Sequence, residues 1–345
     1  MAFEQGLTNE QIAERLATEG TFKNPNTKKV AQLLEEAGRW LLVREDWLSV
    51  LERDTENWEL ADRLLKAYPC LKDAMVIRLR PSGSDGRWSP LRKPTPESEA
   101  AEYLDEFAHT AHNYGETVHV ALSGGETVLK VVSNLFPDRR ANVHFYSAAM
   151  IGRGRMLSSS HVGPETNATI AWLRSGSLPG HLHYGTVAPP DVSIPQKADG
   201  QTRHAKVCRD ILAETQFLAT LKPVNSVLKD IEEATVVITS FGLLPDLLKA
   251  YGANPEILAS EGVIGDLNYC AFNADGNPCK DSAFFLTPGY PNGLEFYRKM
   301  VAKQRRVIVV GGAKDEPAIR AALAGRLFNV LITDEPTATA LLPQS

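Results

Sequence analysis

The sequence lacks the marks of a membrane-bound or secreted protein. Its 345 residues contain no run of the ~18 consecutive apolar residues that a membrane-spanning helix needs. Residues 1–11 carry acidic and amide side chains, where a secretory signal has basic residues followed by an apolar stretch. We therefore expect a cytoplasmic protein without a membrane partner.

Cysteine is scarce and scattered. The four cysteines are Cys70, Cys208, Cys270 and Cys279. They form no CxxC pair and no Cys/His ligand spacing, which argues against a zinc site and a disulfide framework and fits a reducing compartment. His161, His181 and His183 also lack ligand spacing, and we expect them to be exposed loop histidines. We expect neither a metal nor a cofactor.

A strong excess of charge of one sign is also absent. The formal net charge is −5, with 43% hydrophobic and 23% charged residues, close to the average for a globular protein. Because no strong overall field points to nucleic acid or to an anionic membrane, any DNA contact must come from a local patch. The length leaves room for two or three domains at the usual ~100–200 residues each.

From residue 97 onward, helical and strand-like segments alternate. Apolar residues at helical spacing predict helices, and short runs rich in β-branched residues predict strands. The expected strands are 116–122, 142–150, 234–241, 305–312 and 329–334; the expected helices are 97–114, 124–136, 245–252, 315–325 and 337–342. A helix at 58–73, a strand at 74–81 and a polar loop at 82–96 precede them. The alternation predicts an α/β fold, a mostly parallel sheet flanked by helices.

The sharpest local feature is a glycine turn. Ser123-Gly124-Gly125-Glu126-Thr127 follows the expected strand at 116–122 and opens the next helix. Glycines let the backbone approach a ligand closely, and N–H groups at a helix start favour an anion. Ligands also bind at this edge of an open α/β sheet. From the residues alone, a ligand loop and an ordinary strand-to-helix turn remain equally open.

Three more segments place candidate groups near strand ends. Gly242 follows the expected strand at 234–241, and Gly312 ends the one at 305–312. Lys314, just before a helix, could reach a phosphate or carboxylate, or it could be a solvated surface lysine. Asp266, after Gly265, could accept hydrogen bonds from sugar hydroxyls.

These segments, in this order, resemble the SorC family of bacterial transcriptional regulators. Residues 60–77 (LADRLLKAYPCLKDAMVI) resemble the family's entry into its sugar-binding domain, and 121–132 (ALSGGETVLKVV) resemble its glycine-rich ligand loop. Residues 262–278 and 306–342 resemble its last two blocks almost residue for residue. The resemblance covers roughly residues 58–345.

The resemblance implies a fold related to glucosamine-6-phosphate deaminase and ribose-5-phosphate isomerase, used to sense a sugar that is commonly phosphorylated. It implies that Ser123, Gly124, Gly125, Glu126 and Thr127 form the phosphate-side loop, with Asp266 on sugar hydroxyls and Lys314 on an anionic group. Independently of the resemblance, Gly242 and Gly312 are candidate ligand-binding residues because they follow or end expected strands. Because the Glu126 carboxylate would repel a phosphate at close range, either the effector is unphosphorylated or Glu126 faces solvent.

The N-terminal 57 residues resemble the family's helix-turn-helix, with a longer turn. In that motif the second helix enters the major groove, which would place Thr27, Lys28, Lys29 and Gln32 on DNA. Residues 21–44 hold five basic and two acidic side chains, a local basic patch. The alternative is a degenerate helix pair kept for packing or oligomerisation.

The resulting expectation is a sugar- or sugar-phosphate-responsive, DNA-binding transcriptional regulator rather than an enzyme. Its partners would be the sugar effector, operator DNA and further copies of the chain in a dimer or tetramer. Two alternatives stay open: a sugar-phosphate isomerase or deaminase-like enzyme, and a sugar-binding protein that no longer binds DNA.

Overall fold

The computed structural model describes residues 56–78, 95–135, 142–150, 162–176, 178, 180–184, 199–251, 253–279 and 284–343. Trp58–Val76 and Pro96–Ser345 form one compact unit, to which the description below applies. The predicted helix-turn-helix, with Thr27, Lys28, Lys29 and Gln32, lies outside the described residues, as does His161.

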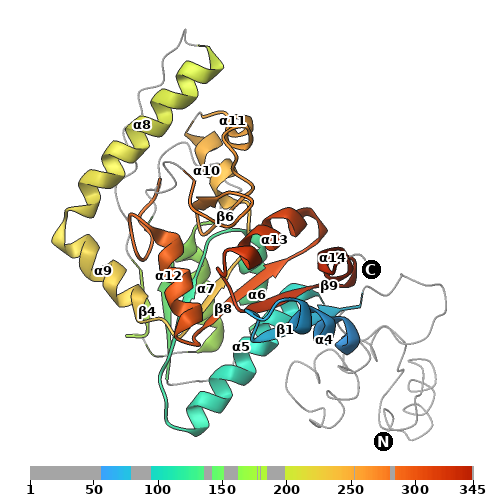
Figure 1. Cartoon of the computed structure of the whole chain (residues 1–345). Helices are drawn as coiled ribbons and strands as arrows, with labels where there is room; N and C mark the ends of the chain where they lie inside the picture. Colours follow the sequence, from blue (N-terminus) through green and yellow to red (C-terminus); the bar gives the residue numbers. More distant parts are fainter. Residues whose placement is uncertain are drawn as a thin grey trace, which may run out of the picture. The chain divides into compact units, whose positions relative to one another are not determined.

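A seven-stranded sheet forms the centre of this unit (Figure 1). Its spatial order is β1 (Asp73–Ile77), β9 (Val330–Asp334), β8 (Arg306–Gly311), β5 (Val236–Thr239), β2 (Val118–Leu122), β3 (Val143–Ser147) and β4 (Leu182–His183). The five pairs from β9 to β4 are all parallel. The predicted α/β fold with a mostly parallel sheet is confirmed.

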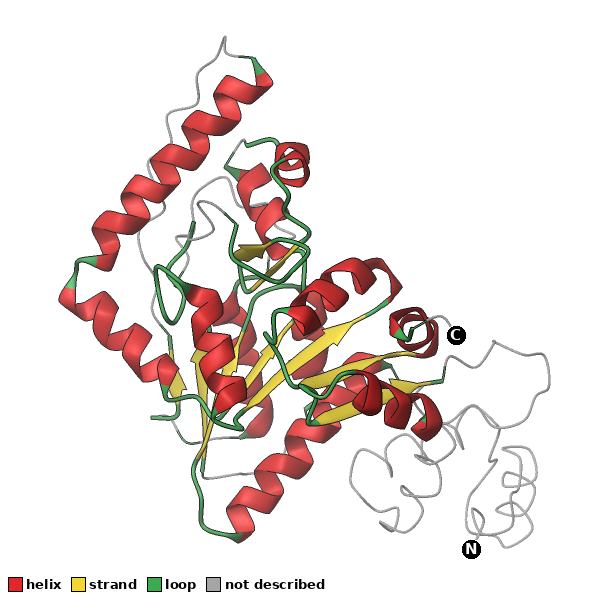
Figure 2. Cartoon of the chain, viewed as in Figure 1, coloured by secondary structure: helices red, strands yellow, loops and turns green. Residues whose placement is uncertain are grey.

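Helices flank the strands (Figure 2). They are α4 (Trp58–Ala67), α5 (Pro96–Asn113), α6 (Glu126–Ser133), α7 (Pro164–Ser175), α8 (Gly200–Ala219), α9 (Lys222–Glu232), α10 (Leu243–Ala250), α11 (Pro255–Ser260), α12 (Gly293–Ala302), α13 (Glu316–Ala324) and α14 (Glu335–Leu341), with a 3₁₀ turn, η2 (Ala313–Asp315). A separate hairpin pairs β6 (Gly265–Leu267) with β7 (Cys270–Phe272).

Alternation along the strands divides the core between the two faces of the sheet. In β8, Val307 and Val309 pack in the cluster that contains residues of α4, α9, α12, α13 and α14. Ile308 and Val310 pack in the cluster that contains residues of α5, α6 and α7. Because a strand covered on both faces must be apolar at every position, β8 reads as a continuous apolar run.

Two parts of the pattern differ from the sequence expectation. The expectation included no helices over 200–232, where the structure has α8 and α9. The prediction of His181 and His183 as exposed loop residues is wrong, because both are half-buried and His183 belongs to β4. Cross-strand partners bury these two rings, and a sequence does not reveal such partners.

Candidate ligand-binding site

The strand order reverses direction between β2 and β5. From β2 the chain winds outward through β3 to β4; from β5 it winds the other way through β8 to β9. Open α/β sheets bind ligands outside the carboxyl ends of the strands at such a switch point. The Ser123–Thr127 loop follows β2 and Gly242 follows β5, so two predicted site segments meet here.

Main-chain and amide contacts hold the Ser123–Thr127 loop. The Ser123 N–H donates to the carbonyl of Ile238 in β5 at 3.0 Å, and the Gly125 N–H donates to the carbonyl of Val162 at 2.8 Å. From α7, the Asn167 Nδ2 donates to the carbonyls of Ser123 (2.8 Å) and Gly125 (3.3 Å). Asn167 is fully buried, and its Oδ1 has no partner among the described residues.

Both glycines in this loop are sterically required. A Cβ on Gly124 would lie 2.2 Å from the Tyr269 Oη and 2.8 Å from the Val162 carbonyl. Gly125 has φ +95° at the N-cap of α6, a conformation that L side chains rarely adopt, and a Cβ there would lie 2.5 Å from Leu243. The loop therefore packs against the β6–β7 hairpin and the start of α10.

Glu126 and Thr127 form the accessible end of the loop. The Glu126 side chain is 75% exposed, and its carboxylate lies 3.5 Å from the Lys130 Nζ on the same helix. Of the two sequence alternatives, this geometry favours a solvent-facing Glu126. Thr127 is half-buried at the first turn of α6, where N–H groups lack intrahelical partners.

Asp266 lies beside the start of α10. It is 1% exposed, and its Oδ1 accepts the Tyr269 N–H at 3.2 Å. Burial raises the pKa of this carboxyl to about 6, although backbone N–H groups of Leu244, Tyr269, Leu243 and Gly242 favour the ionised form. The Oδ2 has no partner of ordinary hydrogen-bond geometry among the described residues. Asp266 therefore joins the β6–β7 hairpin to the Gly242 turn.

Tyr269 is a site residue that the sequence did not reveal. Asn268 (φ 47°) and Tyr269 (φ 68°) form the two-residue turn between β6 and β7, and positive φ at both positions is typical of a type I′ hairpin. Asparagine tolerates this conformation, but for tyrosine it is strained. Its 1% exposed ring packs edge-on against Phe285, with centroids 5.7 Å apart. This packing directs the hydroxyl against Gly124.

Gly312 and Lys314 lie one strand further along the same edge. The Gly312 N–H donates to Asp315 Oδ2 at 3.1 Å, and Lys314 is exposed on η2. β5 separates their strand, β8, from β2. Tyr269 and Leu243 thus link the Ser123–Gly125 loop to Asp266 and to the Gly242 turn, while Lys314 lies one strand away.

Among the described residues, no group of three or more His, Cys, Asp or Glu side chains is arranged to hold a metal ion. Within the same part of the chain, no helix is both long and apolar enough to cross a membrane.

Comparisons with known proteins agree on the class of fold. A family model described as "Putative sugar-binding domain" matches residues 210–343. Over 352 residues the chain is 26% identical to the Deoxyribonucleoside regulator of Bacillus subtilis (strain 168), with 99% of this chain and 94% of that protein covered.

Solved structures give the same answer. The full-length sorbitol operon regulator SorC from Klebsiella pneumoniae is similar with a TM-score of 0.59 and 18% identity, over 99% of this chain and 96% of that chain. A DeoR family transcriptional regulator from Listeria monocytogenes has a TM-score of 0.59 and 16% identity, over 82% of this chain and 98% of that chain. The chain is therefore SorC-like in fold, and the predicted resemblance is confirmed.

Proposed function

We propose that the protein is a sugar-responsive transcriptional regulator. The observation that carries this proposal is the convergence of the Ser123–Thr127 loop, Gly242 and Asp266 at the sheet's switch point, within a SorC-like fold. The similar proteins are named as regulators, which agrees with a sensing role rather than catalysis. A protein that binds an operator works in the cytoplasm, the location that we propose.

The proposed effector is a sugar or a phosphorylated sugar. The names of the relatives point to two kinds of effector. The Bacillus subtilis regulator suggests a deoxyribonucleoside or its sugar, and the Klebsiella pneumoniae regulator suggests sorbitol. Thr127 and the free end of α6 would meet the anionic or most polar part of the effector. Asp266 would accept hydrogen bonds from its hydroxyls, with Gly242, Gly312 and Lys314 around it.

The proposed response is a population shift. An effector that binds one arrangement of a dimer or tetramer more tightly changes operator affinity by its differential binding energy. The operator would be read by Thr27, Lys28, Lys29 and Gln32. If these residues do not bind DNA, the protein would be a sugar-binding protein that acts through other partners.

Two measurements, made one after the other, test the proposal. A thermal-shift screen of sugars and sugar phosphates, including 2-deoxyribose 5-phosphate and sorbitol 6-phosphate, identifies ligands because binding to the folded state raises Tm. Thr127→Val should lower the affinity of any hit about tenfold, the loss of one hydrogen bond to a charged group, whereas the exposed control Thr110→Val should not. The absence of any hit would contradict sugar sensing.

DNA binding is tested by gel shift on the DNA that flanks the gene. We expect a sequence-specific complex whose affinity changes with the effector. Lys28→Ala and Lys29→Ala should weaken this complex and reduce its salt dependence. Sugar binding without any DNA shift at low salt would leave the sugar-binding protein as the function.

The raised pKa of Asp266, to about 6, gives the enzyme alternative one specific argument, because a general acid or base works best with a pKa near the operating pH. We expect no turnover of ribose 5-phosphate or glucosamine 6-phosphate by the pure protein. Turnover that Asp266→Asn abolishes would establish the enzyme alternative instead.

A further inference from the structure

Four histidines gather on one face of the sheet, towards the amino ends of the strands. His119 in β2 stands opposite His144 in β3, and His183 in β4 stands opposite Tyr146. Neighbouring rings stack: the His144 ring centroid lies 4.0 Å from that of His181, 5.1 Å from that of His119 and 5.2 Å from that of His183. We call His119, His144, His181 and His183 the histidine cluster.

One hydrogen bond limits how many protons two rings of the cluster can hold. The His144 Nδ1 and His183 Nε2 lie 2.9 Å apart, and the His119 Nδ1 lies 2.9 Å from the Tyr146 Oη. A neutral imidazole has one donor and one acceptor nitrogen, whereas an imidazolium has only donors. The His144–His183 contact therefore accommodates one shared proton, and full protonation of both rings would set two N–H groups against each other.

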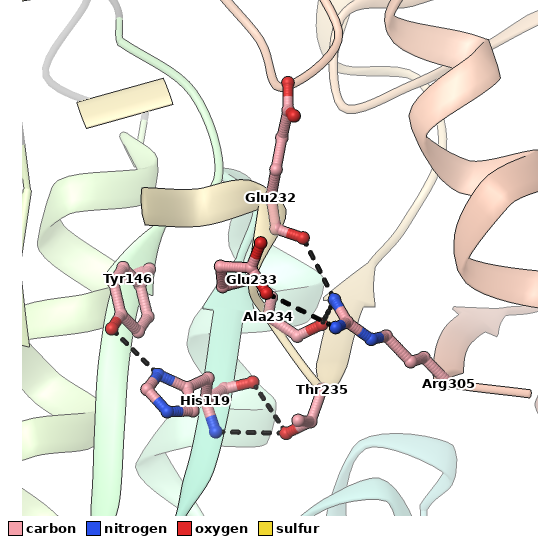
Figure 3. A network of polar contacts seen from close by, with 7 residues as sticks. All are labelled: His119, Tyr146, Glu232, Glu233, Ala234, Thr235 and Arg305. Atoms are coloured by element: carbon pink, nitrogen blue, oxygen red, sulfur yellow. Dashed lines mark hydrogen bonds and ion pairs between the residues drawn. The ribbon is translucent and has the colours of Figure 1, made fainter. Parts of the chain in front are cut away.

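The surroundings supply only partial compensation for added charge. The carboxylate of Asp230 in α9 favours protonation of His183, and that of Glu233, directly after α9, favours protonation of His119. Arg305, before β8, opposes protonation of His119 and donates to the carbonyls of Glu232 and Ala234 at 3.0 Å. Figure 3 shows the part of this network around His119 and Arg305, in which Thr235 also bonds the His119 main chain.

His144 is the least favourable place for a proton. Burial, and then His181, His119 and His183, lower its pKa to about 4. The pKa values of His119 and His183 are also lowered, chiefly by burial. All three groups are therefore neutral in the folded state at neutral pH.

Besides the histidine cluster, β4 is held by a short main-chain pairing and by Leu182, which packs against the core cluster that contains residues of α5, α6 and α7. It is a two-residue edge strand with two register pairs to β3. The Phe145 N–H donates to the carbonyl of His181 at 2.8 Å. Tyr146 stacks on His183 with centroids 4.4 Å apart, so the side chains of the cluster make up much of this junction.

We propose that the histidine cluster is a proton-sensitive clasp, which fastens β4 to β3 when neutral and releases it when protonated. The direction of the pH dependence follows from the thermodynamic linkage between proton binding and release of β4. A group whose pKa is lower in the clasped state binds protons more readily once released, so the clasp is intact above the released pKa of about 6.5 and weakens as pH falls towards 4.

Hydrogen–deuterium exchange of the full chain in EDTA, corrected for intrinsic exchange rates, measures the clasp directly. Between pH 7.5 and 5.5, the amides of 180–184 should exchange roughly tenfold faster in the wild type. This is the factor that one histidine with a pKa lowered from 6.5 to about 4 gives at pH 5.5. Amides of β8 and β9 should keep their protection.

His144→Gln removes the titrating group but keeps a donor and an acceptor, and it should abolish most of this pH effect. His112→Gln, an exposed histidine on α5, is the matched control and should retain it. An NMR titration of wild-type imidazoles decides the matter even if His144→Gln folds poorly: a His144 pKa of 6.5 or above overturns the proposal. Equal exchange of 180–184 at both pH values also overturns it.

Discussion

The two ends of β2 and β3 use different chemistry. At the carboxyl ends, glycines, main-chain groups and the Asn167 amide hold the candidate ligand loop, and the neighbouring β6–β7 hairpin carries the buried Asp266. At the amino ends, stacked imidazoles form a half-buried cluster. The first end depends on shape, and the second depends on protonation. Substitutions and pH should therefore separate them.

The largest expected effect tests the shape of the carboxyl end. Gly124→Ala places a Cβ 2.2 Å from the Tyr269 Oη and 2.8 Å from a main-chain oxygen, so it should lower the free energy of unfolding by about 3 kcal/mol. Chemical denaturation measures the loss. Gly180→Ala, at a position with open space around it, should change stability little, and equal losses would refute the steric argument.

The next effect separates the two ends by the sign of their pH dependence. Because the folded pKa of Asp266 is raised from 3.8 to about 6, its contribution to stability falls as pH rises from about 4 to 6. The histidine cluster does the opposite. As pH rises from 4 to 6, the stability of Asp266→Asn relative to the wild type should increase by roughly 2 kcal/mol. His144→Gln should be more stable relative to the wild type at pH 4 than at pH 6, because it lacks the histidine whose pKa is lowered by folding.

Denaturation midpoints at several pH values measure both profiles. Asp275→Asn removes an exposed carboxylate and serves as the control for Asp266→Asn. Parallel wild-type and Asp266→Asn profiles would contradict the raised pKa.

A smaller effect is expected at Asn167. Asn167→Ala leaves the carbonyls of Ser123 and Gly125 without their amide donor, a loss of roughly 1–2 kcal/mol. Asn225 also donates from Nδ2 to a backbone carbonyl, that of Ala219, but it is exposed. Asn225→Ala should therefore cost less than about 0.5 kcal/mol. Similar losses for the two variants would count against a tightly held loop.

The smallest effect is expected at Glu126. Its ion pair with Lys130 is exposed on both sides, and such pairs contribute less than about 1 kcal/mol. Glu126→Gln should leave stability within about 0.5 kcal/mol and leave sugar-phosphate affinity unchanged. A large gain in affinity would mean that the carboxylate faces the ligand after all.

Sequence patterns predicted the sheet because its strands are continuous apolar runs next to glycine turns. The strands at 305–312 and 329–334 needed no tertiary information, since both faces of each are buried. The patterns did not reveal α8, because two of its five buried positions are the polar residues His204 and Thr215. In α9, by contrast, Val224, Leu228 and Ile231 have helical spacing, so the sequence does contain a signal for this helix.

For the site, the sequence identified loops but not the residues that shape them. Gly124, Gly242 and Asp266 stand next to recognisable strand ends. Asn167 and Tyr269 act across 40 or more residues of sequence on main-chain atoms, and no local spacing reports such contacts. Tyr269 even occupies a turn position that its residue type disfavours.

The fit of Tyr269 over Gly124 has an evolutionary consequence. Two segments far apart in the sequence share one small volume, so neither position can change size independently. A smaller side chain at position 269 would remove the tyrosine ring and hydroxyl, and would leave space for an alanine at position 124. Homologues should therefore show correlated substitution at these two positions, with bulk gained at one only where it is lost at the other.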